Sequence, residues 1–294
     1  MEKVFITGIS GFVGKRIAEM AIKQGYEVSG IDRQGAEIPG VKIDKADVRD
    51  KEAMIKLTKG IDYVVHVAAV TSNLEFQKHL DFCYDINVSG FNSIIEAAYK
   101  NGCKRFVYAS SSAVYKDKFS EDAILNIHGQ KNHYAKTKMI NEMIAASYND
   151  LGVLETVGTR YFNIYGPGEN RKGLYASIVS IYINQMLEDG KVTIYGDGKQ
   201  SRDLIYIDDV AQISLKLLKK GKPGVYNVGT GKSTSYNEIA DMISRGRKDY
   251  VENPLNTYQL LTKADTKRLL DAIGEYKFKD VKEGVKEMMK AAGL

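Results

Sequence analysis

Two groups of polar residues in the first half of the chain have the types and the spacing for hydride chemistry on an alcohol. Tyr134 and Lys138 are four residues apart, so on a helix both side chains project from one face. A phenol with a pKa of about 10 is a poor base, but a nearby ammonium and an oxidised nicotinamide ring favour its phenolate. Ser110-Ser111-Ser112 precedes this pair and supplies a hydroxyl that can share the proton of the substrate.

A glycine-rich segment near the start of the chain indicates where a dinucleotide would bind. Gly8, Gly11 and Gly14 form the pattern G-x-x-G-x-x-G between an apolar strand and an amphipathic helix. The first glycines permit a tight turn close to a pyrophosphate, and the last lets helix and strand pack closely. Free N–H groups at the helix start then face the phosphates. The expected contacts in this segment are Gly8, Gly11, Phe12, Val13 and Gly14.

The ends of the second and third predicted strands carry further candidates for the adenosine half of the cofactor. Asp32 ends the second strand, where its carboxylate would bind the ribose and repel a 2′-phosphate, which favours NAD over NADP. Arg33 leaves NADP open as the alternative, because an arginine at this place could accommodate that phosphate. Asp47 and Val48 follow the third strand and either contact the adenine or belong to a helix N-cap.

The end of the fourth predicted strand is lined by small residues. Ala68 and Ala69 are expected to leave room for the dinucleotide. His66 lies between valines in this strand, and we expect it to be a packed residue close to the cofactor and not a catalytic one.

Apolar periodicity predicts alternating strands and helices through the first half of the chain. The predicted strands cover residues 3–7, 28–31, 41–43, 63–67, 106–109 and 155–159, and the helix that carries Tyr134 covers 134–148. Alternation at this spacing predicts an α/β fold with a Rossmann-type, doubly wound parallel sheet covered on both faces. The carboxyl ends of its strands form the edge where ligands bind.

The character of the sequence changes after Asn163. Residues 166–173 form a loop rich in glycine and charge, and shorter strands and helices follow without strict alternation. We therefore expect an NAD-binding domain over residues 1–163 and a smaller, interleaved substrate lobe over 164–294, with segments near 204–228 returning to the first domain. The tail, 264–294, is expected to form two amphipathic helices.

The composition argues against several classes of protein. The net charge of the 294 residues is +5 with no long basic run, so we expect no nucleic-acid partner. The longest apolar stretches are too short to span a bilayer, and we expect neither a leader peptide nor membrane association. Cys83 and Cys103 lie far apart without a neighbouring cluster of His or Cys, so we expect no metal site, no disulfide and a cytoplasmic location.

Together these motifs resemble the extended short-chain dehydrogenase/reductase family, in its nucleotide-sugar epimerase and dehydratase branch. The resemblance covers nearly the whole chain. It rests on residues 7–14, 66–69, 85–90, 108–115, 134–138, 160–167, 200–204 with 208–210, and 226–229. The last three groups are the most specific, because they separate sugar-nucleotide enzymes from other relatives.

The resemblance implies roles for the residues at matching positions. Tyr134 would be the base, Lys138 its activator and a ligand of the nicotinamide ribose, and Ser111 the hydroxyl partner. Arg202 would clamp the diphosphate, a role that suits a guanidinium because it pairs with phosphate oxygens. Asn163 would hold the nucleotide sugar. The remaining implied contacts are Asn87 and Tyr161 on the cofactor side and Ser112 on the substrate side.

One departure from the family pattern bears on the reaction. Relatives that eliminate water have an Asp-Glu pair after the serine, and decarboxylases tend to have a Glu, whereas this chain has Ser112 and Ala113. Neither residue transfers protons, so the resemblance implies an NAD-dependent nucleotide-sugar epimerase, with UDP-glucose 4-epimerase as the first choice. Such an enzyme oxidises C4 to a ketone, lets the keto sugar turn and returns hydride to the opposite face. The resemblance also implies a nucleotide-diphosphate sugar as substrate and a homodimer.

Two other functions stay open at this point. Residues 165–173 and 258–265 resemble the ADP-heptose 6-epimerase branch, in which a lysine at the position of Lys172 serves as a second base. The alternative for Lys172 is a solvated place on the loop. A non-catalytic dinucleotide sensor is the second rival, although such a protein would be expected to lack the pair Tyr134 and Lys138.

Overall fold

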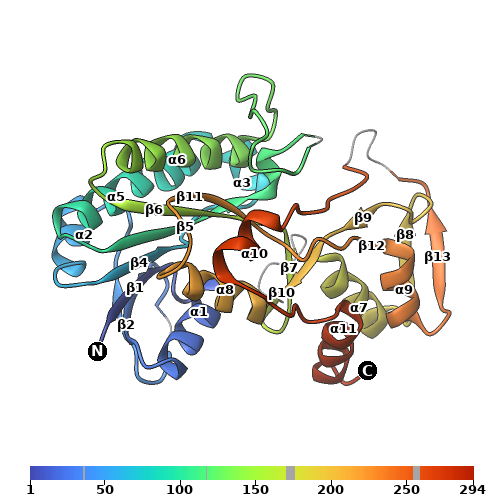
Figure 1. The fold of residues 1–294 in the computed structure, drawn as a ribbon. Helices are drawn as coiled ribbons and strands as arrows, with labels where there is room; N and C mark the ends of the chain where they lie inside the picture. The colour runs from blue at the N-terminus through green and yellow to red at the C-terminus, as the bar shows by residue number, and fades with distance from the viewer. Residues whose placement is uncertain (36, 117, 170–175, 254–258) are drawn as a thin grey trace.

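The computed structural model describes residues 1–35, 37–116, 118–169, 176–253 and 259–294, and its centre is a parallel sheet (Figure 1). The sheet has seven strands in the order β11-β6-β5-β4-β1-β2-β3. These are β1 Lys3–Thr7, β2 Glu27–Asp32, β3 Lys42–Lys45, β4 Tyr63–His66, β5 Arg105–Ser111, β6 Glu155–Tyr161 and β11 Gly224–Val228. The predicted Rossmann-type α/β fold is confirmed. The chain reverses direction through the sheet between β1 and β4, so a ligand crevice forms at the carboxyl ends of these strands.

Both faces of the sheet are buried, because successive side chains point to opposite sides. Val4 and Ile6 pack on one side with α1 Phe12–Lys23, α8 Ile207–Leu217 and α10 Lys267–Ile273. Phe5 packs on the other side with α2 Lys51–Leu57, α5 Gly90–Lys100 and α6 His133–Asp150. The continuous apolar strands of the sequence therefore reflect a sheet covered by helices on both faces.

Other parts of the second half of the chain form a smaller lobe beside the sheet, drawn at the right of Figure 1. Its helices are α7 Ile178–Glu188, α9 Tyr236–Ser244 and α11 Val281–Ala291. Its strands are β7 Asn163–Tyr165, β8 Val192–Tyr195, β9 Ser201–Arg202, β10 Leu204–Tyr206, β12 Thr234–Ser235 and β13 Lys248–Val251. They pair as β10 with β7, β12 with β9 and β13 with β8. Segment 204–228 is divided, since β10 stays in the lobe while β11 joins the central sheet.

Short helices connect the main elements around the crevice. They are α3 Asn73–Lys78, α4 Leu80–Tyr84, a π-helix at Asp85–Ser89 and a 3₁₀ turn, η2, at Ser112–Val114. Helix α6 begins at His133, because the Asn132 side chain accepts a hydrogen bond from the Ala135 N–H and caps the helix. The helix thus begins one residue before the predicted start at Tyr134. Within the described ranges, every helix is too short or too polar to cross a bilayer.

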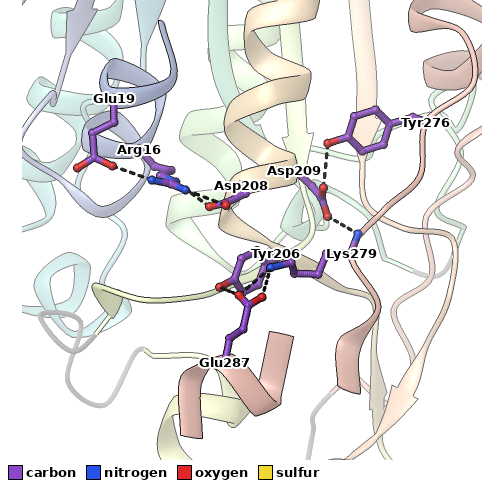
Figure 2. Close-up of polar contacts among 8 residues, drawn as sticks. All are labelled: Arg16, Glu19, Tyr206, Asp208, Asp209, Tyr276, Lys279 and Glu287. Carbon is purple, nitrogen blue, oxygen red and sulfur yellow. Dashed lines mark hydrogen bonds and ion pairs between the residues drawn. The ribbon is translucent and has the colours of Figure 1, made fainter. Parts of the chain in front are cut away.

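One group of polar contacts connects the glycine-rich end of the first domain to α8, and a second group lies next to it within the second half of the chain (Figure 2). The Arg16 guanidinium on α1 donates to both oxygens of Asp208 at the start of α8, at 2.6 and 2.8 Å. The neighbouring carboxylate of Asp209 accepts bonds from the Tyr276 hydroxyl and the Lys279 N–H, at 2.8 and 2.9 Å. Helix α1, which carries the dinucleotide motif at its start, is thus tied to α8, and Asp209 ties α8 in turn to the segment that leads into α11.

Candidate functional site

The glycine turn after β1 has a shape that only glycine fits. Gly8 has a φ of +68°, in the left-handed region, and its carbonyl accepts the N–H of Gly11 at 3.0 Å. A Cβ on Gly14 would lie 2.2 Å from the Gly8 carbonyl oxygen. Helix α1 begins at Phe12 directly after Gly11, without an acidic residue in its first turn. The turn therefore presents a helix N-terminus to the crevice, as a pyrophosphate requires.

A cavity of about 180 Å³ opens beside this turn, between β1, β2 and β4. It brings together eight of the predicted cofactor residues, Gly8, Gly11, Asp32, Arg33, Asp47, Val48, Ala68 and Ala69. The glycine cradle, an acidic residue on β2 and small residues after β4 fit the adenosine half of a dinucleotide.

The carboxylate of Asp32 also shapes the glycine turn. It accepts the N–H of Ser10 at 3.2 Å and the N–H of Gln34 at 3.0 Å. The neighbouring Arg33 guanidinium lies 5.7 Å from the centroid of the Phe82 ring. Asp47 accepts two bonds from the Arg49 guanidinium, which lowers the pKa of its carboxyl. The rim of the cavity therefore holds paired charges of both signs.

Other residues predicted on the cofactor side, among them Phe12, Val13, Asn87 and Tyr161, do not line this cavity. Phe12 and Val13 are the first residues of α1 and pack against the second lobe. The Asn87 amide is engaged with the backbone of Val70, at 2.7 and 2.9 Å, and with Thr137 on α6. The Tyr161 hydroxyl is hydrogen-bonded to Ser214 on α8 at 2.9 Å. Asn87 thus holds the segment after β4 against α6, and a direct contact with the cofactor stays a prediction.

Tyr134, Lys138 and Ser111 meet at the carboxyl end of β5. Tyr134 lies in the first turn of α6 and is hydrogen-bonded to Ser111, the last residue of β5. The Lys138 ammonium lies 5.6 Å from the centroid of the Tyr134 ring and donates to the Ala109 carbonyl at 2.7 Å. Ser111 also accepts the N–H of Ala113, so the 3₁₀ turn fixes its hydroxyl. The predicted catalytic residues form one cluster.

Burial changes the acidity of both candidates. It raises the pKa of Tyr134 to about 12, although the bond with Ser111 acts in the opposite direction. It lowers the pKa of Lys138 to about 8, although the carboxylate of Glu142 raises it. The phenol is therefore neutral at pH 7 in the cofactor-free protein. Lys138 alone does not offset burial, so the expected phenolate depends on the positive nicotinamide ring of bound cofactor.

His66 is a core residue, as expected. Its ring is buried against Phe91 and Phe106, and its Nδ1 is 2.7 Å from the Thr7 hydroxyl. Burial, followed by the charge of Lys138, lowers the pKa of His66 to about 3. A histidine that stays neutral in this way supports the strand end and exchanges no proton near pH 7.

The predicted substrate residues lie on the second lobe and on the turn after β5. The Asn163 amide donates to the Asp203 carbonyl at 3.2 Å and to the Thr262 hydroxyl at 3.0 Å. The Arg202 guanidinium donates to the Ser201 carbonyl and lies 5.4 Å from the centroid of the Tyr236 ring. Ser112 begins the 3₁₀ turn. Lys172 lies outside the described residues.

Three buried charged residues of this region were not predicted from the sequence. Glu142 and Arg160 form an ion pair behind the cluster of Tyr134, Lys138 and Ser111. The fully buried carboxylate of Asp203 accepts the N–H groups of Thr230, Gly231 and Ala264, and so joins β9 to the end of β11. Glu142 lies eight residues after Tyr134 on the same helical face, which is a signal that the sequence does contain.

A parallel sheet with a glycine turn at its first strand and a Ser–Tyr–Lys cluster at its carboxyl edge defines a dinucleotide-dependent oxidoreductase. Comparison with known proteins identifies the family within this class. Residues 4–229 match the model of the NAD dependent epimerase/dehydratase family. A Methanocaldococcus jannaschii protein described provisionally as a UDP-glucose 4-epimerase is 32% identical, with 97% of each chain covered. The chain therefore belongs to the NAD dependent epimerase/dehydratase family.

Solved structures agree with this assignment. The UDP-N-acetylglucosamine 4-epimerase of Methanobrevibacter ruminantium, in complex with UDP-N-acetylmuramic acid, superposes with a TM-score of 0.89 at 27% identity, over 98% of this chain and 97% of that one. The UDP-glucose 4-epimerase of Thermus thermophilus, in complex with NAD, gives 0.85 at 26% identity, over 99% of both chains. The predicted class, an NAD-dependent nucleotide-sugar epimerase, and the predicted cofactor are confirmed.

Proposed function

We propose that this chain is a UDP-glucose 4-epimerase in which Tyr134 acts as the base. The observation that carries the proposal is the cluster of Ser111, Tyr134 and Lys138, followed in sequence by Ser112 and Ala113. The cluster supplies one proton acceptor with its supporting hydroxyl and ammonium. An elimination needs a second acid and base, and residues 112 and 113 supply neither.

Each residue of the cluster has a separate task in this reaction. NAD, when bound, accepts hydride from C4 of the sugar and returns it. The Tyr134 oxygen takes the proton of the C4 hydroxyl and gives it back, while the Ser111 hydroxyl holds the sugar oxygen in line. The Lys138 ammonium favours the phenolate and can bind the nicotinamide ribose. Arg202 would hold the diphosphate. The binding energy would then come from the part of the substrate that stays fixed, while the sugar turns.

Two related substrates are the rivals of UDP-glucose. The similarity to the Methanobrevibacter ruminantium enzyme favours UDP-N-acetylglucosamine as the second candidate. The ADP-heptose 6-epimerase alternative stays open beside it and depends on Lys172, which lies outside the described residues.

A stereochemical assay separates these candidates. The purified chain with NAD is incubated in turn with UDP-glucose, UDP-N-acetylglucosamine and an ADP-heptose, and proton NMR follows the sugar signals. We expect UDP-galactose to form from UDP-glucose until the two sugars reach equilibrium, with Tyr134→Phe as the inactive control. Inversion at C6 of the heptose, or no reaction with UDP-glucose, would refute the proposed substrate.

We also propose a homodimer that forms through the outer faces of α5 and α6. Large apolar side chains are exposed there, with Met143 65%, Leu151 75% and Tyr99 44% accessible. Helix α6 also lacks a clearly polar outer face, since Ile140 and Ile144 are only half-buried. Such a face on a helix pair favours contact with a second protein surface. A cytoplasmic location remains part of the same proposal.

A further inference from the structure

A buried ion pair lies directly behind the proposed catalytic cluster. The Arg160 guanidinium donates to both oxygens of Glu142, at 2.9 and 2.6 Å. The two side chains are only 4% and 9% exposed. Burying two charges costs free energy that their attraction offsets only when the geometry is good, so such a pair is weak evidence for stability. Its position relative to the cluster suggests a different role.

The Glu142 carboxylate and the catalytic lysine bind adjacent residues of β5. Glu142 follows Lys138 by one helical turn on α6, so both side chains lie on one face of the helix. The Lys138 ammonium donates to the Ala109 carbonyl, and the Ser110 hydroxyl donates to Glu142. The next residue of β5 is Ser111. Two adjacent residues of β5 are thus held from α6, directly before the serine that contacts Tyr134.

The other end of the pair reaches the turn after β5 and the edge strand β11. Arg160 donates to the Tyr115 hydroxyl at 2.6 Å, and Tyr115 donates to the Asn227 amide oxygen at 2.7 Å. Tyr115 follows the 3₁₀ turn that begins at Ser112. Each of these side chains has a partner, and a satisfied buried network of this kind restricts the positions of the elements it joins.

The elements around this part of α6 supply few charges. The titratable groups at or near it are His66 on β4, Tyr108 on β5, Tyr115 after η2, Arg160 and Tyr161 on β6, and His133, Tyr134 and Glu142 on α6 itself. Burial keeps the imidazole of His66 and the phenols neutral near pH 7. The π-helix contributes the amide of Asn87, on Thr137, while its carboxylate, Asp85, pairs with Arg49. Among the described residues, Glu142 is therefore the negative charge that acts on Lys138.

We propose that Glu142, held by Arg160, is a positioning residue of the epimerase: its carboxylate keeps Lys138 an ammonium and fixes the β5 segment that carries Ser111. The catalytic part of this inference rests on the function proposed above. The charge state of Lys138 is nevertheless a property of the protein itself. It can therefore be measured whether or not the sugar substrate has been identified correctly.

The test measures the titration of Lys138 in the full chain without NAD. Protein labelled with ¹³C and ¹⁵N at lysine is followed by NMR from pH 6 to 11, and Lys138→Met assigns the signal. Glu142→Gln alone leaves Arg160 buried without a partner and can unfold the chain. The main variant is therefore Glu142→Gln with Arg160→Met, since a neutral pair of similar volume is tolerated at buried sites.

Two single variants separate charge from packing. Ser110→Ala removes the hydroxyl bond to Glu142 and keeps both charges. Glu155→Gln removes a carboxylate that pairs with Arg105 on the same two strands, at their opposite ends, away from Lys138. Together they show whether any change at Lys138 comes from the charge of Glu142 or from disturbance of β5 and β6.

The expected result is a fall in the Lys138 midpoint of about one pH unit in the double variant, with no shift in Ser110→Ala or Glu155→Gln. In the sugar assay, the alkaline limb of the pH profile of kcat should move to lower pH by the same amount in the double variant. Ser110→Ala should lower kcat about tenfold with little change in KM, because Ser111 is less well placed. An unchanged Lys138 midpoint in the folded double variant would overturn the inference. A lowered midpoint in a chain whose wild type converts no nucleotide sugar would support the inference and refute the proposed function.

Discussion

Replacing Lys138 with methionine should stabilise the cofactor-free protein while it removes activity. Lys138 is 1% exposed, and burial lowers its pKa from 10.5 to about 8. Each pKa unit corresponds to about 1.4 kcal/mol, so keeping the ammonium charged at pH 7 costs the folded state about 3 kcal/mol. Methionine leaves the Ala109 carbonyl without its 2.7 Å donor, which costs about 1 kcal/mol. We expect the free energy of unfolding of Lys138→Met to exceed that of the wild type by about 2 kcal/mol at pH 7.

The advantage of the variant should disappear at alkaline pH. Below pH 8 Lys138 is protonated in both the folded and the unfolded wild type. Between pH 8 and about 10.5 the unfolded chain still holds this proton and the folded protein has released it, so wild-type stability rises with pH relative to the variant. At pH 10 this gain is about 2 to 3 kcal/mol, which cancels the difference.

Urea denaturation of the NAD-free proteins at pH 7 and pH 10 measures both differences. Lys136→Met is the matched control, because Lys136 lies on the same helix two residues earlier but is half-exposed. Its effect should stay within about 0.5 kcal/mol at both pH values. If Lys138→Met were the less stable protein at pH 7, or if its difference from the wild type did not change with pH, the account of a buried, costly ammonium would be wrong.

Four further variants test the proposed roles. Tyr134→Phe should bind NAD normally but lose turnover about 10²–10⁴-fold, and near-normal turnover would remove Tyr134 as the base. Arg202→Ala should raise KM for the nucleotide sugar about tenfold or more with kcat within a few-fold, so an unchanged KM would place it away from the diphosphate. Asp32→Ser should shift the ratio of the NADP and NAD dissociation constants at least about tenfold toward NADP, and titration of both cofactors would expose an unchanged ratio. Met143→Glu should convert a dimer to a monomer in sedimentation velocity, while Leu187→Glu on α7 should not; a Met143→Glu dimer would refute the proposed interface.

The cofactor half of the site could be predicted because its requirements are local. Gly8 needs a positive φ and Gly14 must lie close to the Gly8 carbonyl, and both needs appear as residue types at a fixed spacing. Asp32 ends one apolar strand and Ala68 follows another. The carboxyl ends of parallel strands lie at one edge of the sheet. The pattern of strands in the sequence is therefore enough to place these residues together.

The ion pair behind the site was not predicted, because it depends on how strands align. The spacing of Tyr134, Lys138 and Glu142 shows that a carboxylate shares their helical face, but it does not show its partner. Arg160 reaches Glu142 because β6 pairs with β5 in a register that sets Arg160 opposite Ser110. The segments that connect β5 to β6 through α6 are long, so the sequence alone does not show which residues of the two strands pair. The sequence also does not reveal how strongly burial acts on a phenol or an ammonium.

Burial moves the two ionisable groups of the cluster away from the forms that the reaction needs. It raises the pKa of Tyr134 to about 12 and lowers that of Lys138 to about 8, so it opposes both the phenolate and the ammonium. A positive ring beside Tyr134 favours the phenolate, but as a like charge it also makes the ammonium of Lys138 harder to keep. A fixed negative charge that acts on Lys138 and not on Tyr134 favours the ammonium without opposing the phenolate. Glu142 is placed to do this, and Arg160 satisfies its remaining oxygens, which gives a physical reason for a buried ion pair at a site where it adds little stability.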